Sequence, residues 1–275
     1  MRLRQAWLAL ATVTCVACSG SGVRIVRGTP PLDRERVAHV GADAFIAGVF
    51  HDADGTILPY RLLPPLQVVP GERYPLVVHF HNSAAIGDDN RLQIERDVSA
   101  RAWALHEVRA RHPAFVLAPQ FPQRSADYDD PQSPRVAIAA PVLETALALV
   151  DAIAAEHPVD PRRIHATGFS MGASTAWLAA VAQPERFAGI VAMGGVAPDR
   201  ARAATLVELP ILVMHGDADA ENPIRSDLEM VAAIRAAGGR RVRLRQYASL
   251  GHQPPGDLIP GDAWRDWLFE QHRDR

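Results

Sequence analysis

A serine between two glycines lies in the middle of the chain, in the segment Gly168-Phe169-Ser170-Met171-Gly172. The residues before it are strand-like and those after it are helix-like, so we expect Ser170 on a sharp turn between a strand and a helix. Such a turn holds the hydroxyl above the sheet, and the N-terminus of the helix places partial positive charge beside it. Ser170 is therefore a candidate nucleophile for acyl transfer. A tight turn without a chemical role is the alternative.

A nucleophilic serine needs a base, and on a turn of this kind the acid and then the histidine follow it along the chain. His252 and His272 both lie late enough. We prefer His252 because it directly follows a strand-like segment, 241–247, where it can reach a hydroxyl above the sheet. His272 lies in the last few residues, where a solvated role is the simpler interpretation.

Three acidic residues near one strand end compete for the role of the acid: Asp217, Asp219 and Glu221. Asp217 fits a turn in which its side chain accepts a backbone hydrogen bond. Asp219 stands further into the loop, and we predict that it orients His252 and stabilises the imidazolium without taking the proton itself.

The elements that would position these residues alternate between strand and helix along the chain. A hairpin is predicted first, with strands 44–50 and 56–63 around an Asp-Gly turn. Further strands are expected at 75–80, 114–118, 163–169, 188–193, 210–214 and 241–247, and helices at 91–111, 142–156, 170–182, 225–237 and 264–272. This alternation predicts an α/β fold with a mainly parallel sheet, helices on both of its faces and an antiparallel N-terminal hairpin at its edge.

Two connecting segments bear on access to the serine. Residues 120–141 contain four prolines and show no clear period, so we expect a loop at the rim of the active site. Residues 193–210 are too short for a large helical lid, and an open site is expected.

Several motifs together resemble one family. They are Leu58-Pro59-Tyr60-Arg61-Leu62, Tyr74-Pro75-Leu76-Val77-Val78, Asp88-Asp89-Asn90, Asp160-Pro161, Gly168 to Gly172 with Trp177, His215-Gly216 with Asp219, and Gly251-His252. The chain resembles α/β-hydrolases of the bacterial esterase group, which includes predicted peptidases, polyhydroxybutyrate-depolymerase-like and feruloyl-esterase-like enzymes, and relatives of dienelactone hydrolase. The resemblance implies the α/β-hydrolase fold and favours Asp219 as the acid.

An oxyanion hole belongs to this fold. One donor is expected to be the backbone N–H of Met171, and the second to come from the loop after the strand at 75–80, from Ser83 or Asn82. Relatives usually have glycine where Asn82 stands. Because asparagine tolerates a left-handed backbone, we expect the loop to keep its shape.

The N-terminus is typical of an export signal. Arg2 and Arg4 precede an uncharged run at 6–17, too short for a permanent membrane span. The end of the run, with Cys15 and Cys18, resembles a bacterial lipobox in which Cys18 would carry the lipid, although Cys15 stands where leucine is usual. We therefore predict a signal peptide at 1–18, a tether at 19–36 and one hydrolase domain at 37–275, as an envelope lipoprotein. An ordinary cleaved signal of a periplasmic or secreted protein is the alternative.

Composition narrows the remaining classes. A net charge of −2 without a basic run gives no sign of nucleic-acid binding. His79 and His81 form a His-x-His pair without an evident third ligand, so we expect a structural role for His81 and neither metal nor cofactor. Cleavage of a small-molecule carboxylic ester by Ser170, Asp219 and His252 is the predicted function. A peptidase or amidase with the same residues, or a non-catalytic envelope lipoprotein, are the alternatives.

Overall fold

The computed structural model describes residues 22–129 and 134–274. A nine-stranded sheet with the order β1-β11-β10-β9-β8-β4-β5-β3-β2 lies at its centre. The strands are β1 (Val23–Val26), β2 (Ile46–His51), β3 (Ile57–Leu63), β4 (Tyr74–Phe80), β5 (Phe115–Pro119), β8 (Val159–Phe169), β9 (Gly189–Met193), β10 (Ile211–Gly216) and β11 (Val242–Tyr247). Among the described strands of this sheet, the antiparallel pairings are those of β3 with β2 and with β5. The predicted hairpin and the mainly parallel sheet are confirmed.

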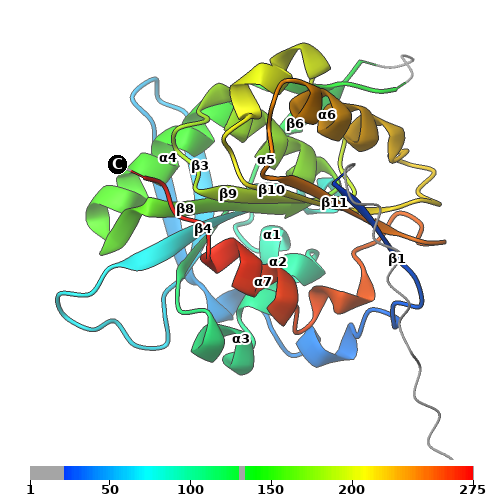
Figure 1. The fold of residues 1–275 in the computed structure, drawn as a ribbon. Coiled ribbons are helices and arrows are strands. Elements are labelled where there is room, and N and C mark those ends of the chain that lie inside the picture. Colours follow the sequence, from blue (N-terminus) through cyan, green and yellow to red (C-terminus); the bar gives the residue numbers. More distant parts are fainter. Residues whose placement is uncertain (1–21, 130–133, 275) are drawn as a thin grey trace, which may run out of the picture.

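Helices cover both faces of this sheet (Figure 1). On one face lie α4 (Val142–Glu156), α5 (Met171–Ala182) and α6 (Arg225–Ala236), and on the other lie α1 (Leu92–Glu95), α2 (Val98–Trp103), α3 (His106–Arg111) and α7 (Asp262–Phe269). The predicted α/β layering is confirmed.

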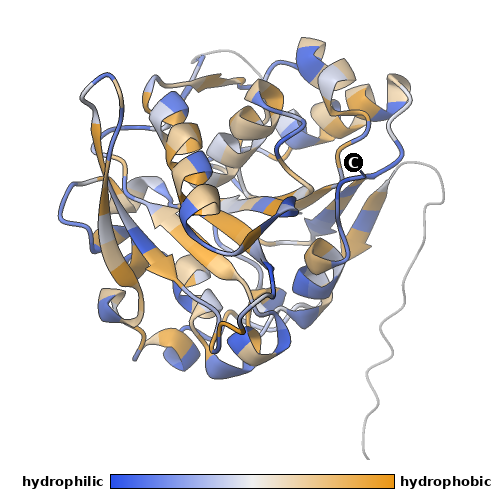
Figure 2. Ribbon diagram, turned by 90° about the vertical axis from the view of Figure 1, so that its left-hand side faces the viewer, coloured by the Kyte–Doolittle hydropathy of each residue, from blue (hydrophilic) through white to orange (hydrophobic). Residues whose placement is uncertain are grey.

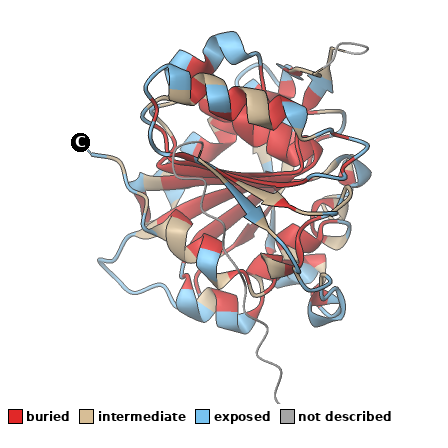
Figure 3. Ribbon diagram, turned by 45° about the vertical axis from the view of Figure 1, so that its right-hand side comes forward, coloured by how far each residue is buried: buried red, intermediate tan, exposed pale blue. Residues whose placement is uncertain are grey.

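The central strands are apolar because both of their faces are buried. In β4, Leu76, Val78 and Phe80 pack into the core under α4 and α5, while Val77 packs into the core on the opposite face. Figure 2 shows the sheet as a largely hydrophobic layer, and Figure 3 shows the same strands buried and the outer faces of the helices exposed. This rigid layer carries the loops at the carboxyl ends of the strands.

The single helix predicted at 91–111 is wrong, because three short helices occupy this segment. The Asp97 carboxylate accepts hydrogen bonds from the N–H groups of Ser99 (2.8 Å) and Ala100 (3.3 Å), so it starts a new helix in the middle of the apolar pattern. Leu105, with φ −59° and ψ 134°, separates α2 from α3.

The tether predicted at 19–36 is wrong for residues 23–26, which form the edge strand β1. β1 pairs in parallel with β11, with Val23 opposite Leu244 and Val26 opposite Tyr247. An extended segment can hydrogen-bond to the backbone N–H and C=O groups that β11 would otherwise leave unpaired at its edge. The β-branched residues of β1 also favour a strand. The signal segment and Cys18 lie outside the described residues.

The segment predicted as a loop at 120–141 contains a small antiparallel pair, β6 (Ala126–Tyr128) and β7 (Ala137–Ala139). Between β9 and β10, the described chain carries one 3-10 helix, Arg200–Leu206, in agreement with the expectation of no large lid. Within the described ranges, no helix has the length and apolarity that a bilayer span requires.

Candidate active site

Ser170 occupies the turn between β8 and α5, as the glycine pattern predicts. Its backbone has φ 57° and ψ −123°, a conformation that is strained for any residue but glycine. The turn is possible because its glycines allow backbones to come together. A Cβ atom on Gly172 would lie 1.9 Å from the carbonyl oxygen of Phe80 in β4, and one on Gly168 would lie 2.4 Å from the carbonyl carbon of Gly172. The strain directs the serine side chain out of the sheet.

Three predicted residues meet above the carboxyl ends of β8, β10 and β11. His252 Nε2 lies 2.9 Å from Ser170 Oγ, and His252 Nδ1 lies 2.7 Å from Asp219 Oδ2. Because a carboxylate only accepts, Nδ1 carries the hydrogen, and Nε2 is left to accept from the serine hydroxyl. The Phe169 ring packs 5.0 Å from the imidazole, centroid to centroid. This arrangement can remove a proton from Ser170.

The Asp219 carboxylate is buried and held on both oxygens. Its Oδ1 accepts the backbone N–H groups of Glu221 (3.0 Å) and Asn222 (2.8 Å), while Oδ2 faces His252. Burial opposes ionisation, but hydrogen bonds from His215, His252 and the Asn222 backbone outweigh it and hold the pKa of Asp219 well below its usual range. Asp219 is therefore ionised wherever His252 can act as a base.

The two competing acids and the second histidine have other positions. Asp217 accepts hydrogen bonds from Ser249 N–H (2.7 Å) and the Gln246 side chain (3.1 Å), so it shapes the loop that leads to His252. Glu221 lies at the rim, with its carboxylate 3.7 Å from His252 Nε2 and 75% exposed. His272 follows α7 and lines a different pocket. Only Asp219, of the three candidates, hydrogen-bonds His252 Nδ1.

The predicted oxyanion donors differ in whether their backbone N–H already donates to another group. Met171 N–H and Ser83 N–H donate to no group in the described ranges, and both residues line a hollow with Ser170. Asn82 does not adopt the left-handed backbone that asparagine tolerates, because its backbone is extended, with φ −73° and ψ 168°. Its N–H donates to Asp97 Oδ2 (3.2 Å), so it is not available to an oxyanion. Asn82 instead shapes the loop, since its side chain accepts Ala84 N–H at 3.0 Å.

His81 braces this loop from beneath. Its Nε2 accepts the N–H of Phe121 (3.0 Å), so its Nδ1 donates to the carbonyl oxygen of Asn82 (2.7 Å). Burial lowers the pKa of His81 to about 4, which keeps it neutral. His79 contacts Thr167 and Asp97. No group of three or more potential metal-binding side chains occurs among the residues described.

Two hollows meet at Ser170, Ser83 and Glu221. One, of about 470 Å³, is lined by Arg124, Asp127, Tyr128, Arg135, Met171 and Asn222 in addition, and the other, of about 250 Å³, reaches His252, Phe169 and Pro254. Residues of the 120–141 segment thus form part of the rim, as predicted. The lining residues Arg124, Tyr128 and Arg135 could not be predicted individually. The proline-rich segment shows no periodicity that would indicate which of its side chains face inward.

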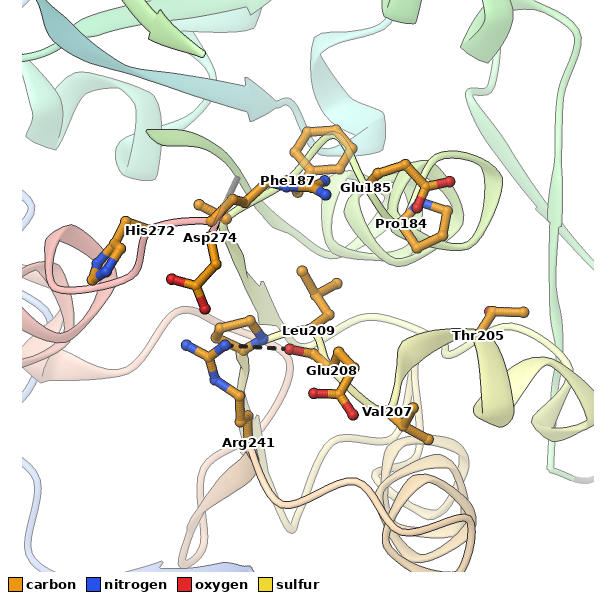
Figure 4. Close-up of a pocket in the computed structure, with 13 residues that line it drawn as sticks. Pro184, Glu185, Phe187, Thr205, Val207, Glu208, Leu209, Arg241, His272 and Asp274 are labelled. Atoms are coloured by element: carbon orange, nitrogen blue, oxygen red, sulfur yellow. Dashed lines mark hydrogen bonds between the residues drawn. The ribbon is translucent and has the colours of Figure 1, made fainter. Parts of the chain in front are cut away.

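A separate pocket of about 330 Å³ lies at the amino ends of β9 and β10 (Figure 4). Ser170 lies at the other end of the strands. Leu209, Arg241, His272 and Asp274 are among the lining residues of the pocket. It contains none of the residues around Ser170, so it is not part of the candidate active site.

A buried pair behind Asp219 was not predicted from the sequence. His215 Nδ1 lies 2.7 Å from Asp227 Oδ2, and both side chains are fully buried. The only signal available was a histidine just before the acid-bearing loop, because Asp227 belongs to a different element, α6.

Known proteins are similar to this chain in sequence and in fold. A family model described as phospholipase/carboxylesterase matches residues 127–259. NocK of Nocardia uniformis subsp. tsuyamanensis, to which an esterase activity is ascribed, is 26% identical over 294 residues, covering 92% of this chain and 81% of NocK.

Solved structures agree. The crystal structure of a thermostable esterase is 32% identical with a TM-score of 0.75, and the match covers 84% of this chain and 64% of that one. Dipeptidyl peptidase 4 of Porphyromonas gingivalis is 15% identical with a TM-score of 0.63, and the match covers 82% of this chain and 35% of that one. This likeness shows the fold alone. The chain therefore has the α/β-hydrolase fold and is similar in sequence to esterases of that superfamily.

Proposed function

We propose that the chain hydrolyses carboxylic esters through an acyl-enzyme intermediate on Ser170. The observation that carries this proposal is the continuous pair of hydrogen bonds from Asp219 through His252 to Ser170, at 2.7 and 2.9 Å. A serine hydroxyl is a weak nucleophile unless an adjacent base takes its proton, and this arrangement supplies that base.

Acylation follows from the geometry. Ser170 Oγ attacks the ester carbonyl carbon while its proton passes to His252 Nε2, and the carbonyl oxygen becomes an anion. The N–H groups of Met171 and Ser83, two residues that line the hollow beside Ser170, are the donors that we propose for this oxygen. When the tetrahedral intermediate collapses, the bond to the alkoxide breaks and His252 returns the proton to it. Asp219 stabilises the imidazolium in between.

Deacylation repeats these steps with water. His252 takes a proton from water, the hydroxide attacks the acyl carbonyl, and Ser170 leaves with the proton that His252 carries. Esters are favoured over amides as substrates because the relative NocK and the thermostable esterase carry esterase names. Turnover of an ester and an amide with the same acyl group would compare the two activities directly.

The test uses Ser170→Ala. The variant should lower kcat for aryl esters by about 10⁴-fold or more, and a fluorophosphonate probe should no longer label the protein. Ser99→Ala is the matched control, since the Ser99 hydroxyl is buried in α2 without a partner among the described residues. Undiminished turnover or labelling in Ser170→Ala would refute the proposal.

We also propose that the domain is exported and held at a membrane through a lipid on Cys18. The support is the charged start, the short apolar run and the cysteine that follows it. Cys18→Ala should move the protein from the membrane fraction to the soluble fraction and abolish labelling by a radioactive fatty acid. An unchanged membrane fraction would contradict the anchor.

A further inference from the structure

A buried histidine outside the proposed catalytic residues supports the acid loop. His215 lies at the carboxyl end of β10, and its side chain is completely inaccessible to solvent. Its Nδ1 is 2.7 Å from Asp227 Oδ2, and its Nε2 is 2.8 Å from the carbonyl oxygen of Asn222 and 3.4 Å from Asp219 Oδ2.

The partners of His215 determine its charge. A backbone carbonyl can only accept, so Nε2 must carry a hydrogen to bond Asn222. An ionised carboxylate can also only accept, so Nδ1 must carry one to bond Asp227. Burial disfavours the charge, but hydrogen bonds to Asp219 and Asp227 outweigh it and raise the pKa of His215 to about 10. His215 is therefore an imidazolium at neutral pH.

The same contacts connect the acid loop to the helix that follows the serine. Asp227, in α6, accepts a hydrogen bond from Trp177 Nε1 in α5 at 3.1 Å. Asn222, whose carbonyl His215 holds, donates its own N–H to Asp219 Oδ1 and its side-chain amide to the carbonyl oxygen of Gly194. A closed path thus runs from α5 through Asp227, His215 and the acid loop to His252, and back to Ser170.

We propose that His215, held as a buried cation by Asp227, is a positioning residue for the acid and base of this site. It fixes the loop that presents Asp219, and its positive charge offsets part of the negative charge that His252 experiences from Asp219. The inference rests on the proposed function, and it adds two residues on which the strength of the base depends. Asp219 and Asp227 are the titratable side chains that face His215 in the described ranges, with His252 one hydrogen bond beyond.

The experiment is the pH dependence of kcat/KM in His215→Gln. The acidic limb of this profile reports protonation of the base in the free enzyme. Without the cation, the full negative charge of Asp219 acts on His252, so the base keeps its proton to higher pH. We expect the acidic limb to move upward by about 0.5–1 pH unit. Loss of the anchor on the acid loop should also lower kcat by about 10- to 100-fold.

Two further variants separate these effects from damage to the fold. His215→Gln/Asp227→Asn removes both buried charges and keeps amide groups that can pair, so it remains measurable if the single variant fails to fold. Its acidic limb should also move upward, by less than in the single variant, because the more distant negative charge is lost too. His165→Gln removes another fully buried imidazole, in β8, that has no hydrogen-bond partner among described side chains, and should leave the limb in place.

The outcomes are distinct. An acidic limb that stays at the wild-type pH in a folded His215 variant would show that this residue only fills space, and would overturn the inference. Wild-type protein that neither hydrolyses esters nor reacts with a fluorophosphonate would instead refute the proposed function. The rate of fluorophosphonate labelling against pH gives the same readout without a substrate.

Discussion

At the scale of single residues, the site depends on how closely the backbone around Ser170 can approach β4. Gly172, in the first turn of α5, lies directly against the Phe80 carbonyl. A side chain there would have to push two backbone segments apart, which neither a rotamer change nor a flexible neighbour can relieve. The left-handed φ of Ser170 is tolerated only because this packing holds it.

Gly172→Ala should therefore destabilise the protein by more than about 2 kcal/mol and displace the serine, with loss of nearly all ester turnover. Gly251→Ala is the control, because its Cβ would meet only the Ala218 carbonyl oxygen, at 3.9 Å. Urea unfolding and ester turnover of the two variants provide the measurement. Equal stability of both would contradict the clash.

At the scale of elements, the strand order places His252 in a loop next to the edge of the sheet. β11, which precedes that loop, has only β1 between it and solvent. The N–H groups of Leu244 and Ala248 donate to the carbonyl oxygens of Gly22 (2.8 Å) and Val26 (2.9 Å). The N-terminal segment thus closes an edge that would otherwise be open to pairing with another chain.

A chain that starts at Gly28 lacks β1, and we expect it to be less stable by about 1–3 kcal/mol than a chain that starts at Gly22. It should also associate through the uncovered edge of β11. Urea unfolding and light scattering of the two proteins test both expectations. If the shorter chain is as stable and as monomeric as the longer one, β1 has no role in closing the sheet.

At the scale of the whole molecule, buried histidines limit the pH range in which the fold is stable, because burial and contacts lower the pKa of some and raise the pKa of another. Burial lowers the pKa of His81 to about 4 and that of His165 to about 3, so both are neutral when folded. Their contribution is complete above about pH 6.5 and is lost as the pH falls, because the unfolded chain binds protons that the folded protein does not. His215, with its pKa raised to about 10, contributes below about pH 6.5, and this contribution is lost as the pH rises to 10.

Stability should therefore be greatest near neutral pH and fall on both sides. Between pH 6.5 and 5, the wild-type protein should lose about 2 kcal/mol through His165. His165→Gln should lose that much less over the same interval, while the decline above pH 7 stays as it is. Free energies of unfolding in urea at pH 5, 6.5 and 9 are the measurement. Parallel acid declines of the two proteins would show that His165 is not the cause.

Features that depend on neighbouring residues and on the order of the elements could be predicted from the sequence alone. The glycines around Ser170 define its turn locally, and the order serine, acid, histidine along the chain is the order expected for this fold. The α/β layers could be predicted because short apolar segments alternate with helix-like ones. A strand that helices cover on both faces must be apolar over its whole length.

Features whose partners are distant in the chain could not be predicted and are visible only in the folded protein. The helix predicted at 91–111 divides because Asp97 caps α2 while it holds the N–H of Asn82, and the same bond keeps Asn82 out of a left-handed conformation. β1 forms on the edge of β11, about 220 residues away, and His215 becomes a cation because α6 brings Asp227 against it. Local pattern determines which segments fold into which element, whereas hydrogen-bond partners and buried charge depend on which elements come together.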